Sequence, residues 1–177
     1  MKLKILLLLL TFSHISSAQI FTTINGHADF LSEAPLEVIK ASTEELQGVL
    51  DLGQKTFAFK MYIKSFDGFN NPLQKVHFFE NYMEVRQFPT ATFTGKILEE
   101  LDSKRKVYRA KGMLSIHGVQ VERIIEVNLD LGPENIAFDA NFSVPLADFN
   151  IDLPRIVYQK IAQVISVNVH GNMKIKK

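Results

Sequence analysis

The feature that most constrains this chain is a long stretch of alternating residues between Lys106 and Asp130. Apolar residues recur at second positions in two arms that meet at His117-Gly118, and this pattern predicts a β-hairpin with one apolar face. Each arm has about 12 residues, which gives about 40 Å at roughly 3.3 Å per residue, against about 17–20 Å for a usual strand. Strands of this length favour a tall barrel.

The same alternation predicts further strands along the chain. Residues 54–65 place Phe57, Phe59, Met61 and Ile63 on one face of a half-buried strand. The other strands are expected at residues 46–52, 91–97, 136–144 and 164–174. We therefore expect seven or eight strands in total.

Two helices are expected to interrupt the sheet. Asn71 and Pro72 form a helix start, and a helical apolar period follows until Pro89. Asp152 precedes a second apolar stripe that includes Ile156, Val157, Ile161 and Ile165. Strands at short spacing with two helical insertions predict an all-β domain, either an antiparallel barrel or a sandwich. Each helix has one apolar stripe to cover, so in a barrel both are expected to act as lids or plugs.

The first 18 residues are predicted to be a signal peptide. Lys2 and Lys4 precede an apolar run, and Ser16-Ser17-Ala18 supplies the small residues of a cleavage site after Ala18. The apolar run is much shorter than the roughly 20 residues that span a bilayer, which argues against an uncleaved anchor. One folded domain is expected to occupy residues 20–177.

Composition excludes several classes of function. The formal net charge is +1, so no global field attracts nucleic acid. The chain has no cysteine, which excludes disulfides, thiolate metal sites and cysteine nucleophiles. It has 14 phenylalanines and no tryptophan, and this favours a wholly apolar interior over a polar active site.

Five segments together resemble the YceI-like family in sequence, order and spacing. They are residues 26–35, 77–84, 88–93, 112–119 and 142–151, and the resemblance covers residues 20–177. It implies a single extended antiparallel, lipocalin-like β-barrel of about eight strands with two short helical insertions. It also implies a periplasmic or secreted bacterial protein that holds a long isoprenoid or quinone-like amphiphile in a hydrophobic tunnel.

The expected tunnel wall follows from the inward phases of the strands and the apolar stripes of the helices. An eight-stranded barrel can be filled by side chains or hold one small ligand, and composition leaves both open, but the long hairpin and the resemblance favour a cavity. The strands are expected to contribute Phe59, Met61, Phe93, Ile125, Phe138 and Phe142, and the helices Phe79, Tyr82, Val157 and Ile161. Arg123 shares the phase of Val121 and Ile125, so it either grips a polar head group or is turned outward at a bulge or strand end.

No catalytic or metal site is predicted. His27, His77, His117 and His170 lack the spacing of a metal pair on one element, and His117 is expected to make only a local turn contact. No G-x-S-x-G motif is present. The expected function is non-enzymatic binding, carriage or buffering of an isoprenoid-type lipid, with no other cofactor. The alternative is a lipid-free structural or stress-associated interaction module. Nucleic acid is not an expected partner, while transient membrane contact and the oligomeric state stay open.

Overall fold

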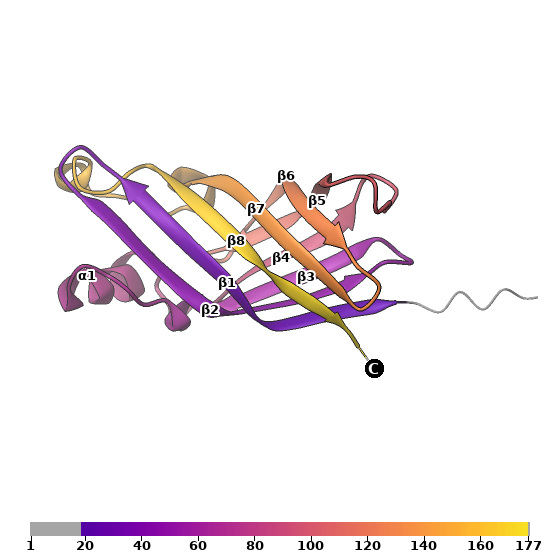
Figure 1. Cartoon of the computed structure of the whole chain (residues 1–177). Coiled ribbons are helices and arrows are strands. Elements are labelled where there is room, and N and C mark those ends of the chain that lie inside the picture. The colour runs from indigo at the N-terminus through magenta and orange to yellow at the C-terminus, as the bar shows by residue number, and fades with distance from the viewer. Residues whose placement is uncertain (1–18, 177) are drawn as a thin grey trace, which may run out of the picture.

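The strands follow one another in chain order and close into a barrel. The computed structural model describes residues 19–176, in which each strand pairs antiparallel with the next and β8 pairs with β1. The predicted antiparallel barrel is therefore confirmed, and the sandwich is excluded (Figure 1). The predicted signal peptide lies outside the described residues. The eight strands are β1 (Ile20–Glu33), β2 (Val38–Asp51), β3 (Thr56–Tyr62), β4 (Thr90–Ile97), β5 (Val107–Ile116), β6 (Val119–Leu131), β7 (Asn135–Pro145) and β8 (Val164–Ile175).

The long hairpin predicted between Lys106 and Asp130 is formed by β5 and β6. Their pairing runs without a register shift from Val107 opposite Asn128 to Ile116 opposite Val119. His117 and Gly118 form the turn with φ of 51° and 75°. Two positive φ angles are typical of the tight hairpin turn whose twist matches that of the strands it joins. The predicted hairpin is confirmed.

The predicted face of β3 is also confirmed. Phe57, Phe59, Met61 and Ile63 all face the barrel interior. The strand itself is shorter than predicted, because it ends at Tyr62 and residues 63–65 form a 3₁₀ turn. Ile63 keeps its inward direction within that turn and is buried.

Sequence reasoning missed β1 and residues 38–45 of β2, which include its whole first half. The register between them shifts between Thr23 and Gly26 and again between Gly26 and Ala28. Each shift breaks the period of two that marks a half-buried strand, so the apolar positions do not alternate simply. Both strands are nevertheless 14 residues long and make the most extensive strand pair of the barrel.

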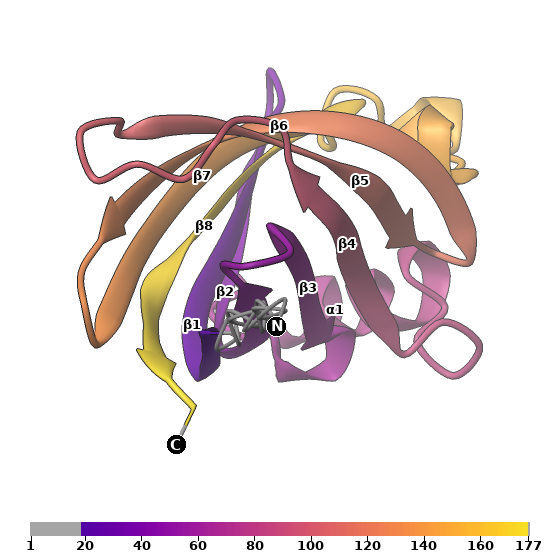
Figure 2. The same ribbon diagram turned by 90° about the vertical axis from the view of Figure 1, so that its right-hand side faces the viewer.

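The two ends of the barrel are built differently. The closed end has three short connections, and Phe21, Tyr108 and Ile136 are fully buried inside it. Figure 2 views the barrel from this end, which also carries the C-terminus. The open end has two long connections and two tight turns. The closed end comprises residues 52–55, 98–106 and 132–134, and the open end comprises residues 34–37, 63–89, 117–118 and 146–163.

The first predicted helix is confirmed at the open end. Helix α1 (Pro72–His77) begins after Asn71, whose side chain accepts a hydrogen bond of 2.9 Å from the backbone N–H of Gln74. Pro72 occupies the first helical position, where its missing N–H costs nothing. The helix continues as a π-helical turn, η2 (Phe78–Tyr82). No helix in residues 19–176 has the length and apolar character needed to cross a bilayer.

The prediction of a second helix is wrong. Residues 153–163 contain only a 3₁₀ turn, η4 (Arg155–Val157), followed by irregular turns. The backbone there bonds to other segments: the Gln159 carbonyl accepts from Leu36 N–H at 2.8 Å, and Ala162 N–H donates to Ser32 Oγ at 2.9 Å. Within the segment only isolated turn bonds form, such as Lys160 N–H to the Val157 carbonyl at 2.8 Å, so the hydrogen bonds to other segments take the place of a continuous helical series.

Candidate binding cavity

A cavity of about 510 Å³ occupies the barrel interior. Side chains from the inner faces of all eight strands line it, and residues of α1 and of the 146–163 connection surround its mouth at the open end. Its volume lies within the range of about 300–1,000 Å³ that is usual for small-molecule sites. The cavity stops at the closed end, where Phe21, Tyr108 and Ile136 are buried but do not line it.

Phenyl rings form the deeper part of the wall. The ring centroids of Phe57 and Phe93 lie 4.9 Å apart, and those of Phe59 and Phe138 lie 5.2 Å apart. Two glycines let these rings lie against the sheet: a Cβ at Gly48 would come within 2.3 Å of the Phe59 ring, and one at Gly171 within 3.0 Å of the Phe138 ring. The wall is therefore both apolar and closely fitted.

A second aromatic cluster lies nearer the mouth. Pairing of β2 with β3 ends at Gln47 opposite Lys60, and the two strands part beyond that point. The gap is filled by the cluster of Phe30, Phe66, Phe69 and Phe78, in which Phe30 stacks on Phe78 at 5.1 Å. All four line the cavity, and sequence reasoning missed them because three lie in a connection without a period of two.

Two charged residues on the strands, Asp29 and Lys60, belong to the cavity lining, and both have polar partners. Asp29 Oδ1 lies 3.2 Å from His27 Nε2, and Lys60 Nζ lies 3.0 Å from the Tyr62 hydroxyl. The remaining polar lining groups gather at the mouth, where Gln74 Nε2 donates to Glu37 Oε1 at 2.9 Å. Burial raises the pKa of the Tyr82 hydroxyl, so this lining residue stays neutral.

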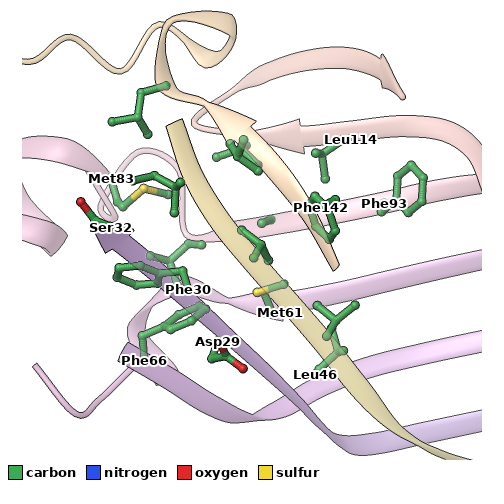
Figure 3. Close-up of a pocket in the computed structure, with 18 of the residues that line it drawn as sticks. Asp29, Phe30, Ser32, Leu46, Met61, Phe66, Met83, Phe93, Leu114 and Phe142 are labelled. Atoms are coloured by element: carbon green, nitrogen blue, oxygen red, sulfur yellow. The ribbon is translucent and has the colours of Figure 1, made fainter. Parts of the chain in front are cut away.

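Most of the residues predicted for the wall do line the cavity. Figure 3 shows Met61, Phe93 and Phe142 with Leu46 and Leu114 around it. Val157 and Ile161 reach the cavity from irregular backbone instead of from a helix. Whether these side chains bind a ligand stays a prediction. The predicted residues that line the cavity are Phe59, Met61, Tyr82, Phe93, Ile125, Phe138, Phe142, Val157 and Ile161.

Phe79 is wrongly placed by the sequence prediction. It does not line the cavity but packs against the buried cluster that includes Met83 and borders a separate pocket with Glu80 and Arg86. The prediction assumed a regular α-helix, whereas the π-helical turn at residues 78–82 changes the phase of the side chains. Phe78 takes the inward position instead.

Arg123 also lies outside the cavity lining. It pairs with Gly112 in an uninterrupted register, so the outward bulge considered from the sequence is absent from this hairpin. Its guanidinium Nη2 donates to the carboxylate of Asp148 in the 3₁₀ turn η3 (Leu146–Phe149), while Nε is buried without a partner in residues 19–176. Neither of the two placements considered from the sequence is observed, and the guanidinium instead holds η3.

His117 makes long-range contacts, contrary to the local contact predicted for it. Nδ1 lies 3.1 Å from the Phe149 carbonyl oxygen, and Nε2 lies 2.9 Å from Glu84 Oε2. The imidazole thus joins the hairpin turn to both long connections of the open end. The other three histidines of residues 19–176 lie apart from it: His27 stacks on His170, and His77 lines the mouth. No group of three His, Asp or Glu side chains in residues 19–176 is arranged to hold a metal ion.

The fold and its interior define a closed eight-stranded antiparallel barrel with an apolar cavity that opens at one end. The sequence matches the YceI-like domain over residues 13–173, so the chain belongs to the YceI-like family.

Solved structures share this fold at low sequence identity. A polyisoprenoid-binding domain from Saccharophagus degradans, implicated in plant cell wall breakdown, superposes with a TM-score of 0.71 at 11% identity, covering 90% of this chain and 100% of that one. BcnA from Burkholderia cenocepacia has a TM-score of 0.68 at 15% identity, covering 83% and 95%. The YceI protein of Campylobacter jejuni has a TM-score of 0.59 at 18% identity, covering 100% and 91%. A search of curated proteins finds no match to this sequence.

Proposed function

We propose that this protein binds and carries, or buffers, a long-chain amphiphile of the polyisoprenoid or isoprenoid quinone type. The observation that carries the proposal is the cavity of about 510 Å³, which is apolar throughout its depth and has polar groups at its mouth. Such a gradient suits a ligand that enters tail first and leaves its head group near water. The similarity to a polyisoprenoid-binding domain supports the same ligand class.

Burial of an apolar tail supplies the affinity without any specific polar contact. Each methylene removed from water contributes about 0.8 kcal/mol, so about ten buried carbons contribute about 8 kcal/mol before the cost of immobilising the ligand. The alternative, a lipid-free interaction module filled by its own side chains, is disfavoured because the wall phenylalanines leave a cavity open.

The proposal contains no catalytic step. In residues 19–176, no acid that lines the cavity is hydrogen bonded to a base that lines it. We also propose that the protein acts in the periplasm or outside the cell after removal of residues 1–18.

Organic extraction of the purified protein followed by mass spectrometry tests the proposal. We expect a long-chain isoprenoid amphiphile in a fixed ratio to protein. Ala140→Phe should lower that ratio, because Ala140 lines the cavity and the added ring occupies ligand volume. The matched control is Ala137→Phe on the outer face of the same strand. Absence of an extractable amphiphile, or equal lipid content in the two variants, would contradict the proposal.

A further inference from the structure

Large apolar side chains are exposed around the mouth of the cavity. Ile156 is 87% exposed, which is the highest value among the large apolar residues of 19–176. Leu36 and Leu73 are 66% and 63% exposed. We use the name docking rim for Leu36, Val38, Leu73, Ile156 and Tyr158, all of which are exposed.

Hydrogen bonds hold the docking rim together although its residues come from three segments. Leu36 N–H donates to the Gln159 carbonyl at 2.8 Å, which joins the β1–β2 turn to the 146–163 connection. Asn70 Nδ2 donates to the Val38 carbonyl at 2.8 Å and fixes the start of α1 beside the same turn. Figure 1 shows the turn and the connection together at the end of the barrel where α1 lies. The rim is thus one preformed surface.

The apolar surface of the rim continues into the cavity. Leu73 is exposed and also lines the cavity. Val157 and Ile161 line it from the same short segment whose Ile156 and Tyr158 face outward. An apolar molecule therefore meets apolar side chains along the whole path from the outside to the interior.

Two cations beside the rim fit lipid head groups, and Glu37, the acid between Leu36 and Val38, accepts a hydrogen bond from Gln74. Arg155 and Lys160 flank Ile156 and Tyr158, and neither forms an ion pair with an acid of residues 19–176. Aliphatic side chains with a tyrosine and flanking basic residues match the layers of a bilayer surface, where acyl chains lie below phosphates. Five side chains cannot supply the roughly 800 Å² that each partner buries in a stable protein complex. The size of the rim therefore argues against a protein partner.

We propose that the docking rim inserts into the surface of a phospholipid bilayer, with Arg155 and Lys160 on lipid phosphates, so that the cavity opens directly onto the membrane. This inference goes beyond lipid binding, because it assigns the surface and the orientation through which cargo would enter and leave. Binding of the protein to a membrane can be measured without identifying the lipid in the cavity.

Flotation with vesicles of phosphatidylethanolamine and phosphatidylglycerol in equal parts tests the proposal. Ile156→Ser should reduce the bound fraction by about tenfold, the equivalent of losing one buried aliphatic side chain from the bilayer. The matched control is Ile24→Ser, since Ile24 is 78% exposed on the outer face of β1, away from the rim. All variants carry the same N-terminal residues, so any contribution of the predicted signal peptide to flotation is the same in each.

A second pair of variants tests the charges. Arg155→Gln combined with Lys160→Gln should weaken binding to phosphatidylglycerol vesicles by more than tenfold at low salt, since each cation contributes about 1 kcal/mol near an anionic surface. Binding to phosphatidylcholine vesicles should change much less. Equal flotation of Ile156→Ser and Ile24→Ser, or a wild-type protein that does not float, would overturn the proposal.

Two further measurements separate docking from cargo binding and from self-association. An Ile156→Ser protein that keeps its extractable lipid but loses flotation supports docking, and a wild-type protein that floats without extractable lipid supports docking while refuting the proposed function. Light scattering measures the mass of wild type and Ile156→Ser. A dimer that dissociates in the variant, without vesicle binding by the wild type, would assign the rim to a second copy and overturn the proposal.

Discussion

The two ends of this barrel close the same strands by different physical means. At the closed end, the side chains of Phe21, Tyr108 and Ile136 are fully buried. The Tyr108 hydroxyl donates to the carbonyl of Asp102. At the open end, the two long connections pack around their own buried residues, among them Ile63 and Phe149, but they surround the cavity mouth and are joined by polar contacts such as His117 with Glu84. The difference teaches that one end is filled across the whole barrel, whereas the other packs its connections around a cavity that stays open.

Tyr108→Ala should produce the largest effect on folding. Removing a fully buried aromatic ring leaves a cavity and unpaired polar groups, with an expected loss of about 3–5 kcal/mol in the free energy of unfolding. Tyr158→Ala at the open end should change it by less than about 0.5 kcal/mol, because that ring is exposed. Urea denaturation of both variants checks this, and equal losses would contradict the difference in burial between the two rings.

His117→Asn should have a smaller effect that is specific to the open end. Asparagine tolerates the positive φ of this turn, so the change removes the ring contacts and keeps the backbone. We expect a loss of about 1–2 kcal/mol from the bonds to Phe149 and Glu84. Residues 78–88 should also become more susceptible to limited proteolysis. His170→Asn is the control, because His170 is exposed on the outer face. A similar result for both would show that His117 does not hold the connections.

Asn71→Ala should loosen α1 at the mouth. The substitution removes the side-chain acceptor of the Gln74 N–H, at a cost of about 1 kcal/mol for a typical N-cap. Amide hydrogen exchange of residues 72–77 measures the effect locally. Asn71→Ser restores an N-cap acceptor and should exchange like the wild type, so fast exchange in both variants would count against the capping role.

Glu99→Gln should have the smallest effect, a loss of stability at the closed end that is present at neutral pH and disappears in acid. The backbone N–H of Arg109, followed by its side chain, lowers the pKa of Glu99 from 4.5 to about 2. Because the folded-state pKa is lowered, this carboxylate stabilises the fold above pH 4.5, and that stabilisation is lost as the pH falls towards 2. Urea midpoints measured across this window should fall less steeply in Glu99→Gln than in wild type or Glu100→Gln. Parallel curves would refute the assignment.

Local patterns predicted most of the barrel but not the covering of its mouth. The β5–β6 hairpin and the face of β3 were predictable because residues two apart share a face whatever the rest of the chain does. The β1 strand escaped detection because its register shifts break that period. The predicted second helix failed because Gln159 and Ala162 bond to the β1–β2 region instead of to their own turn.

The residues of the cavity were likewise predictable where a strand period places them and unpredictable elsewhere. Phe93 and Phe142 were predictable as wall residues from the phases of their strands. Phe79 was misplaced by a π-helical turn that no period reveals, and Phe66 was missed because its role depends on where β2 and β3 part. The partner of Arg123 is Asp148, and only the folded chain brings the two together.

The pairing of β1 with β8 has a consequence for the order of events during folding. Phe21 lies opposite Ile175, so the hydrogen-bonded ring cannot form until both strands are available together. Until then, each of these strands presents unpaired amides that can recruit another chain. Contacts between such distant positions slow folding into the millisecond to second range. Aggregation at this stage should therefore compete with closure, and refolding yield should fall as protein concentration rises.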